Sequence, residues 1–322
     1  MKEVIQLSQV QLLIGTLLCS GLVVILPGFN PITILIWGAA FLITGLYVDK
    51  KNVLLIFAFN IVLMYVLLAD VAYIAFSLVS IGLPSLIMGL LLAQAKDYYA
   101  VRKAGMISAL VGVTLMLGMI WLQGYTLEAT MTEQIAGNIR MEMEQYLTAG
   151  VFDRYLQQGL TFEELSAMAD TTGVWVATYF PALKYIQSII SVFIILSLAV
   201  AWARFKRMAI LLKRPYVWEH MPWQFSWLVI LGLALWYFDL SSMGVIGANI
   251  VFIMAVICLY YGNAVLLYHY QFAFSPKRRR WVFMAFLMFT LFLPQIVIMF
   301  AMIIGLFDSL VDFRNLKKEK KA

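Results

Sequence analysis

Long apolar stretches, separated by short polar segments, run along almost the whole chain. A membrane-spanning helix needs about 20 mainly apolar residues, because it rises about 1.5 Å per residue across a hydrocarbon core about 30 Å thick. The pattern therefore predicts an all-α, polytopic transmembrane helical bundle. The stretches that we expect to cross the bilayer as single helices are 9–26, 32–48, 53–68, 71–92, 106–122, 182–202, 223–238 and 245–267.

The last apolar stretch, 281–311, is long for one span and short for two, and Pro294 interrupts it. Because proline removes a backbone N–H and clashes with the preceding helical turn, we expect two short helices that turn back near Pro294. The prediction is then about ten crossings, six before the basic loop at 204–214 and four after it. The number falls to about eight if one of the early hairpins has been divided too finely.

A polar segment, 125–180, separates the fifth predicted span from the sixth. Thr130–Glu133 and Thr161–Glu164 both have the spacing of a capping box, in which a Thr hydroxyl and a Glu carboxylate satisfy free N–H groups at a helix start. Apolar residues recur between them at helical spacing. We expect a short, external, amphipathic insertion of two helices that lie on or beside the membrane surface.

The distribution of charge predicts the topology. Apolar residues make up 63% of the chain and charged residues 12%, against about 25% charged in a soluble domain, so lipid must cover much of the surface. Short cytoplasmic loops are enriched in Lys and Arg, and the segment 125–180 is rich in acids. We therefore expect a multi-pass protein of the cell (plasma) membrane, with both termini cytoplasmic and 125–180 outside. The basic segments then fall inside, at 50–51, 96–103, 204–214, 277–280 and 314–321.

The layout favours a single membrane domain, 1–322, rather than independent folding units. Within it, 1–203 forms a six-span half that includes the external insertion, and 204–322 forms a four-span half with a basic tail. The loop Arg204–Pro222 is the natural seam between the halves.

Motifs for catalysis and for cofactors are missing from the sequence. The chain has no G-x-x-x-x-G-K-[ST] loop, no H-E-x-x-H motif and no G-x-S-x-G motif. Cys19 and Cys258 both lie in apolar stretches, and His220 and His269 lie in different segments, so neither a disulfide framework nor a metal site is expected. The basic clusters fit the topology and anionic lipid. We expect no enzyme activity, no cofactor and no nucleic-acid partner.

Polar side chains inside the predicted spans are the candidates for a solute site, because lipid makes them costly and they usually face the bundle interior. The functional interpretation is a polar pocket that opens outward and holds a small solute. The alternative is helix–helix hydrogen bonding, worth about 0.6 kcal/mol per bond on average. We favour that alternative for each Asn and Gln, and a simple loop role for the Asp. The candidates are Asn60, Asp70, Tyr73, Asn249, Asn263 and Gln295.

Gly82-Leu83-Pro84-Ser85 interrupts the fourth predicted span. A proline inside a span kinks the helix and frees a carbonyl group. Broken helices line substrate sites in some transporters, and a plain packing kink is the more common cause. Ser108 and Gly112, four residues apart in the next span, allow close helix packing.

The end of the chain carries the most specific pattern, Gly305-Leu-Phe-Asp308-Ser-Leu-Val-Asp312-Phe-Arg314. This pattern resembles the closing motif of the YybS-like family of uncharacterised bacterial polytopic membrane proteins. Phe180-Pro181-Ala182, at the entry to a span, and Met221-Pro222-Trp223, after the basic loop, also resemble that family. The resemblance covers nearly the whole chain in its layout.

The first six spans resemble the membrane-embedded substrate-binding subunit of energy-coupling-factor vitamin transporters. This resemblance implies a solute bound near the outer face, and a coupling subunit and two ATPases as partners. The chain departs from that pattern by adding four C-terminal crossings and the external insertion. It also has no clear A-x-x-x-A coupling motif in the first span, where Gly15 and Cys19 are the nearest pair of small residues.

The terminal motif also has a physical interpretation. Asp308 and Asp312 are four residues apart and so share one helix face, and Arg314 follows them. We favour a structural role, in which these residues pair with the basic loops and fasten the last hairpin, over a role in docking a partner.

Two function hypotheses follow from the sequence, and the lipid bilayer is the partner in both. The first is binding or transport of a small solute, with a coupling subunit and ATPases as further partners. The second is a non-transporting membrane scaffold that organises an envelope or signalling complex.

Overall fold

A computed structural model of the chain describes residues 9–26, 29–122, 161–208, 213–238 and 243–314, together with Leu211 and a few isolated residues between 137 and 159. These described residues are mainly α-helical and include no β-strand. Six of their helices are long and apolar enough to cross a membrane, and three shorter helices are also apolar. The fold class predicted from the apolar pattern, an all-α polytopic bundle, is confirmed.

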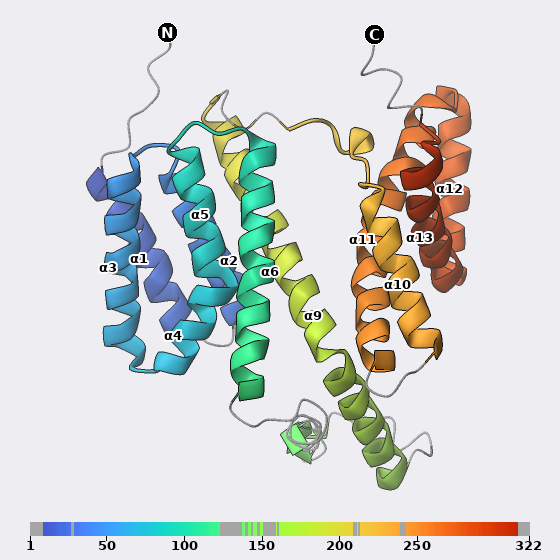
Figure 1. Ribbon diagram of the computed structural model, residues 1–322, viewed down its shortest axis with the longest axis horizontal. Coiled ribbons are helices and arrows are strands. Elements are labelled where there is room, and N and C mark those ends of the chain that lie inside the picture. Colours follow the sequence, from blue (N-terminus) through green and yellow to red (C-terminus); the bar gives the residue numbers. More distant parts are fainter. Residues whose placement is uncertain are drawn as a thin grey trace. The chain divides into compact units, whose positions relative to one another are not determined.

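The chain divides into two compact units (Figure 1). The first unit comprises Met1–Tyr125 and Lys184–Lys213, and the second comprises Thr126–Leu183 and Arg214–Ala322. The chain passes from the second unit back to the first within one helix, α9 (Phe162–Phe205). Helix α9 therefore contributes its first half to the second unit and its second half to the first.

Large buried side chains form the centre of the first unit. Trp37 and Phe41 of helix α2 and Phe57 of helix α3 are all buried, and their ring centroids lie 5.0, 5.1 and 6.4 Å apart. Such edge-to-face and offset ring pairs stabilise a core beyond the burial of their area. The helices of this unit are α1 (Gln9–Ile25), α2 (Asn30–Thr44), α3 (Lys50–Leu68), α4 (Val71–Ser77), α5 (Leu83–Leu92), α6 (Tyr98–Leu122) and the second half of α9.

A five-residue π-helix, Leu78–Gly82, joins α4 to α5. Pro84 follows it, and a proline ring clashes with the carbonyl group four residues earlier, here that of Ser80. The wider π turn relieves this clash within a continuous element, so the interruption predicted at Gly82–Ser85 takes the form of a π-helix. Helix α6 approaches it closely at Gly112, where an added Cβ would lie 2.5 Å from the Val79 carbonyl oxygen. The close packing predicted at Gly112 is confirmed.

The second unit contains the predicted terminal hairpin. Helices α12 (Pro276–Phe292) and α13 (Pro294–Val311) are separated by Leu293, next to Pro294. The two short helices predicted in the last apolar stretch are therefore confirmed. Helix α11 (Met243–Phe272) packs against both α10 (Gln224–Phe238) and α13, and also contacts α12.

Helices α11 and α13 cross at very short range. An added Cβ on Gly262 would overlap the carbonyl oxygen of Ala301, and one on Gly305 would overlap that of Cys258. Cys258 and Gly262 on α11, like Ala301 and Gly305 on α13, are four residues apart and share one helix face. Small residues at this spacing let membrane helices pack backbone against backbone. The close crossing therefore explains why the terminal motif has a glycine at position 305.

Helix α9 differs from the prediction in its length. We expected a short amphipathic helix ending near Phe180 and a separate span from Ala182, whereas Phe162–Phe205 is one helix that continues through Pro181. Its start agrees with the predicted capping box. The Glu164 N–H donates to Thr161 Oγ1 over 3.2 Å, and the Thr161 N–H donates to Glu164 Oε2 over 2.8 Å.

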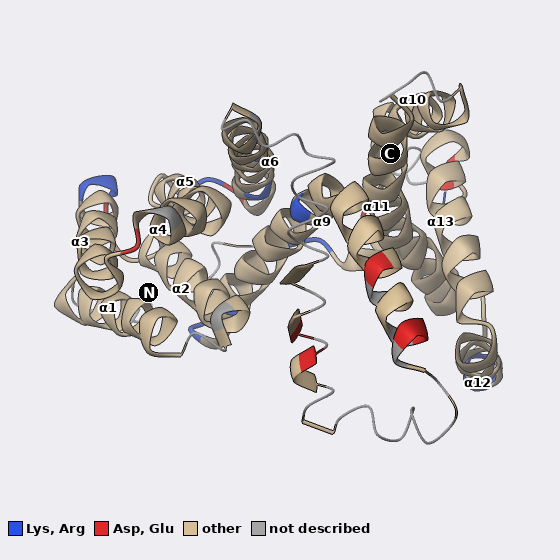
Figure 2. Cartoon of the chain, turned by 90° about the horizontal axis from the view of Figure 1, so that it is seen from below, with Lys and Arg blue, Asp and Glu red and all other residues tan. Residues whose placement is uncertain are grey.

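The other predicted capping box, Thr130–Glu133, lies outside the described residues, as does most of the insertion 125–180 before Thr161. The described helices carry few charged residues along their lengths (Figure 2). In the first unit, basic residues stand at the start of α3 and of α6 and at the end of α9. A bilayer requires this distribution, because charge in the hydrocarbon region is costly.

Candidate functional site

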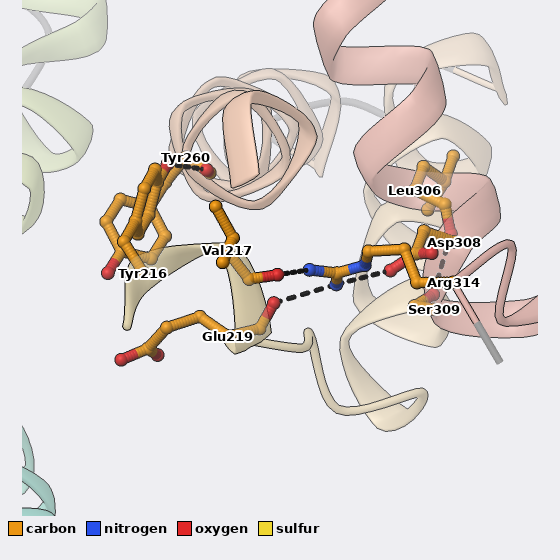
Figure 3. Close-up of polar contacts among 8 residues, drawn as sticks. All are labelled: Tyr216, Val217, Glu219, Tyr260, Leu306, Asp308, Ser309 and Arg314. Atoms are coloured by element: carbon orange, nitrogen blue, oxygen red, sulfur yellow. Dashed lines mark hydrogen bonds and ion pairs between the residues drawn. The ribbon is translucent and has the colours of Figure 1, made fainter. Parts of the chain in front are cut away.

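The terminal motif forms a buried ionic contact in the second unit (Figure 3). Arg314 Nη2 lies 2.7 Å from Asp308 Oδ2 and 2.7 Å from the carbonyl oxygen of Glu219, and Nη1 donates to the carbonyl oxygen of Val217 over 2.6 Å. Asp308 is 1% exposed and Arg314 is 3% exposed. We call this group of Asp308, Arg314 and the two carbonyl groups the C-terminal clasp.

The end of α13 places the two charged side chains of the clasp. Asp312 follows the last residue of the helix in the left-handed conformation, with φ +53°, and its N–H donates to the Asp308 carbonyl oxygen. The chain then turns, so that Arg314 reaches back to Asp308, six residues earlier. Asp308 and Arg314 therefore pair with each other. Arg314 also binds the loop 213–223, which precedes α10, through the backbone carbonyl groups of Val217 and Glu219. Asp312 shapes the turn between Asp308 and Arg314.

Aromatic contacts hold the same loop against α11. The Tyr216 hydroxyl donates to the carbonyl oxygen of Tyr260, and their rings lie edge to face with centroids 4.9 Å apart. The Trp218 ring lies 5.6 Å from that of Tyr268 and 6.0 Å from that of Phe272. Clasp and aromatic contacts together fix this loop between α11 and the end of α13.

Because the pKa of Tyr216 is raised in the folded protein, we expect the protein to lose stability at high pH. Burial, with a smaller contribution from the negative charge of Glu219, raises the pKa of Tyr216 from 10.0 to about 12. The folded state thus favours the neutral phenol, and this stabilisation is complete below pH 10 and lost as the pH rises toward 12. We expect the melting temperature of the purified protein to fall across that interval, and to fall less in Tyr216→Phe. Equal slopes for the two proteins would contradict this assignment.

In the first unit, polar side chains with buried polar atoms lie on α2 and on the α4–π–α5 element. Tyr73, Ser77 and Ser85 lie on that element at multiples of four residues, and Trp37 comes from α2. An added Cβ on Gly38 would lie 2.8 Å from Ser85 Oγ, and one on Gly82 would lie 3.2 Å from the Trp37 ring. These glycines therefore bring α2 into direct contact with the element. We call Trp37, Tyr73, Ser77 and Ser85 the polar seam.

The polar seam is buried but lacks hydrogen bonds. Trp37 Nε1, Tyr73 Oη, Ser77 Oγ and Ser85 Oγ are all inaccessible to solvent and have no hydrogen-bond partner among the described residues. Nearly all buried polar groups in proteins are paired, so four unpaired atoms on two neighbouring elements need an explanation. A polar ligand that enters between the helices would provide the missing partners.

Asn60 of α3 has a structural role. Its Oδ1 accepts from Ser20 Oγ over 2.5 Å, and its Nδ2 donates to Thr16 Oγ1 over 3.0 Å and to the Ile56 carbonyl oxygen over 2.7 Å. Ser20 and Thr16 belong to α1, and Asn60 is completely buried. The side chain therefore fastens α1 to α3 by the helix–helix hydrogen bonding that we favoured as the alternative to a solute site.

Asp70 and Tyr73 lie at the start of α4 but differ in surroundings. Asp70 is exposed and caps the helix, since its Oδ1 accepts from the Tyr73 N–H over 3.0 Å. Tyr73 is half-buried, and its hydroxyl is inaccessible to solvent and has no hydrogen-bond partner among the described residues. Of the two, only Tyr73 joins the seam.

Asn249 of α11 forms hydrogen bonds with backbone groups of α9 beside Pro181. Its Oδ1 accepts from the Ala182 N–H over 3.0 Å, and its Nδ2 donates to the Thr178 carbonyl oxygen over 2.9 Å. A regular α-helix would pair that carbonyl and that N–H with each other. The side-chain amide thus satisfies both backbone groups at the proline, which explains why α9 continues through a residue that we expected to separate two helices.

Replacing Asn249 should destabilise the second unit. Asn249→Leu leaves the Thr178 carbonyl and the Ala182 N–H without their buried partners, and we expect a loss of about 2 kcal/mol in the free energy of unfolding. Asn263→Leu on the same helix is the matched control, because no hydrogen bond to Asn263 is seen among the described residues. Unfolding in detergent measures both, and equal losses would contradict the role of Asn249.

The remaining candidates lie apart from these contacts. Asn263 is half-buried on α11, and Gln295 is exposed in the first turn of α13. Within the parts of the chain that the structure describes, no three His, Cys, Asp or Glu side chains lie together as ligands of a metal ion. The polar seam thus combines one predicted residue, Tyr73, with Trp37, Ser77 and Ser85, which sequence reasoning missed. The Ser85 beside Pro84 was the available signal for it.

Apolar spanning helices, charges near their ends and polar contacts inside each unit define a polytopic helical membrane protein. Residues 13–309 match the model of the family DUF2232, described as a predicted membrane protein. Because this match covers most of the chain, the protein belongs to that family. No curated protein and no solved structure matches the chain in the same comparisons. The match confirms the expected family of uncharacterised membrane proteins, and it does not test the YybS-like name or the resemblance to energy-coupling-factor subunits.

Proposed function

We propose that the first unit binds a small polar solute at the polar seam and takes part in its transport across the plasma membrane. The observation that carries this proposal is the set of four buried, unpaired polar atoms of Trp37, Tyr73, Ser77 and Ser85. Each buried polar atom without a partner costs about 1–3 kcal/mol. A solute that pairs with these atoms removes that cost, so the seam favours binding.

The π-helix supports a site that opens and closes. The seam is closed in this structure, because Ser77, Ser85 and Trp37 are completely buried and Gly38 and Gly82 bring α2 against Ser85 and the π-helix. Solute entry therefore requires α2 to separate from the α4–π–α5 element. Single-turn π-helices occur frequently at functional sites, and interrupted helices line the substrate sites of some transporters. The resemblance of the first six spans to the substrate-binding subunit of energy-coupling-factor transporters supports the same function.

The alternative is a scaffold that docks envelope or signalling proteins through the terminal motif. A docking motif must be accessible, whereas Asp308 and Arg314 are buried against the protein's own α13 and loop. The geometry of the clasp therefore favours the solute proposal over the scaffold.

The proposal includes an orientation. The basic residues at the starts of α3 and α6 and at the end of α9 support a cytoplasmic location for those ends, since Lys and Arg are enriched in short cytoplasmic loops. Both termini are then cytoplasmic. A separate coupling subunit and ATPases would supply the energy for transport.

The seam makes a prediction about stability and ligand binding. Ser77→Ala and Ser85→Ala remove unpaired hydroxyls, so each should leave the melting temperature of the ligand-free protein unchanged or raised. Ser20→Ala is the matched control, because it removes a buried hydroxyl that is bonded to Asn60, and it should lower the melting temperature. A broad metabolite screen should find compounds that raise the melting temperature of the wild type and raise that of Ser77→Ala/Ser85→Ala less. A screen without any stabilising compound would overturn the proposal.

A further inference from the structure

The chemistry of the polar seam indicates a class of solute, and this inference rests on the proposed function. All four seam side chains are uncharged. Trp37 Nε1 can only donate a hydrogen bond, whereas the hydroxyls of Tyr73, Ser77 and Ser85 can donate or accept. A solute that pairs with Trp37 must therefore present an acceptor.

The surroundings of the seam disfavour an ionic solute. None of the seam residues is an acid or a base, and the aliphatic side chains of Ile81 and Ile195 stand beside Ser85 against Gly38. An ion that enters such a site loses its hydration and gains no counter-charge, which is far more costly than burying a neutral polar group. The same aliphatic neighbours favour a solute with an apolar body.

Lys184 is a basic residue near α4 that would favour an anionic solute instead of an uncharged one. Lys184 Nζ lies 5.1 Å from the centroid of the Phe76 ring and donates to Gln187 Oε1 over 3.3 Å. Phe76 is 37% exposed, whereas the next residue, Ser77, is completely buried. Lys184 therefore contacts α4 at the partly exposed side chain of Phe76. If an anionic solute bound this unit, Lys184 would be the group to recognise it.

We infer that the polar seam selects an uncharged compound that has an apolar body and a hydrogen-bond acceptor, and that the acceptor pairs with Trp37 Nε1–H. This inference assigns the seam a ligand class and gives Trp37 the role of the specificity-determining donor. Trp37→Phe keeps an aromatic ring at that position and removes only the donor and part of the ring volume.

Matched compounds of equal shape and different charge test this inference. The probes are benzamide and benzoate, indole-3-carboxamide and indole-3-carboxylate, and orotamide and orotate, each titrated at pH 7 against the purified full chain. We expect the neutral member of at least one pair to bind more tightly than its anion. We expect Trp37→Phe to weaken that binding by about fivefold or more, and Lys184→Gln to leave it unchanged.

Trp202→Phe controls for the loss of ring volume, because Trp202 Nε1 already donates to Tyr47 Oη over 2.9 Å in the same unit. This variant should bind the neutral probe like the wild type, and Ser85→Ala gives a second, smaller change at the seam. Tighter binding of the anions with loss in Lys184→Gln, or neutral binding that Trp37→Phe leaves intact, overturns the inference while the proposed function stands. If no probe binds and the broad metabolite screen also fails, both are overturned.

Discussion

Gly262→Ala and Gly305→Ala should each lower the free energy of unfolding of the second unit by about 3 kcal/mol, the upper end of the range for overpacking. The added Cβ would overlap a backbone carbonyl oxygen, that of Ala301 or of Cys258. A backbone group cannot rotate away as a flexible side chain can, so α11 and α13 must move apart. Their separation also weakens the contact between α10 and α13 through Ser226 and Ser309, whose hydroxyls lie 2.6 Å apart.

The chain offers matched controls for these substitutions. An added Cβ on Gly15 of α1 or Gly118 of α6 would meet nothing within 4 Å, so Gly15→Ala and Gly118→Ala should leave stability unchanged or raise it slightly, since Ala is the better helix former. Unfolding in mixed detergent, followed by circular dichroism, measures all four variants. If the four variants showed the same stability, the close crossing of α11 and α13 would be refuted.

Breaking the C-terminal clasp should have a comparable effect. Arg314→Met leaves the Asp308 carboxylate and the carbonyl groups of Val217 and Glu219 buried without their donor. Removing one partner of a buried ion pair costs about 3–5 kcal/mol, and we expect a loss in that range for Arg314→Met. Asp308→Asn keeps the shape of the side chain and should cost less, because the amide oxygen can still accept from Arg314.

A double variant separates the ion pair from the carbonyl contacts. Asp308→Leu/Arg314→Met removes both charges together, so its loss of stability should be smaller than the sum of the two single losses. It should still exceed zero, because the two loop carbonyl groups stay unpaired. Thermal unfolding of the wild type, Asp308→Leu, Arg314→Met and the double variant completes the cycle. Additive losses would show that Asp308 and Arg314 do not interact.

Local rules account for the features that the sequence predicted well. Pro294 separates two helices, and the hairpin of α12 and α13 follows. The capping box at Thr161–Glu164 likewise depends on neighbours three residues apart. The apolar spans are set by the thickness of a bilayer. Each of these features needs only a short window of sequence.

Features that depend on distant segments could not be predicted. Pro181 gave the same local signal as Pro294, yet α9 continues through it because Asn249 on another helix satisfies its backbone. For Asn60 the sequence favoured helix–helix hydrogen bonding over a solute site, but it did not show that the partners come from α1. The polar seam could be recognised only when α2 was placed against the π-helix and α5, since nothing in the sequence pairs Trp37 with Ser85.

The central claim is that the polar seam holds a small solute, and small molecules retained during purification test it most directly. The wild type and Ser77→Ala/Ser85→Ala would be purified from native membranes in gentle detergent, and mass spectrometry would identify the bound small molecules and proteins. We predict a metabolite that is enriched with the wild type and depleted in the double variant, together with a coupling subunit and ATPases. Envelope or signalling proteins with no small molecule, or the same metabolite in both samples, would contradict the claim.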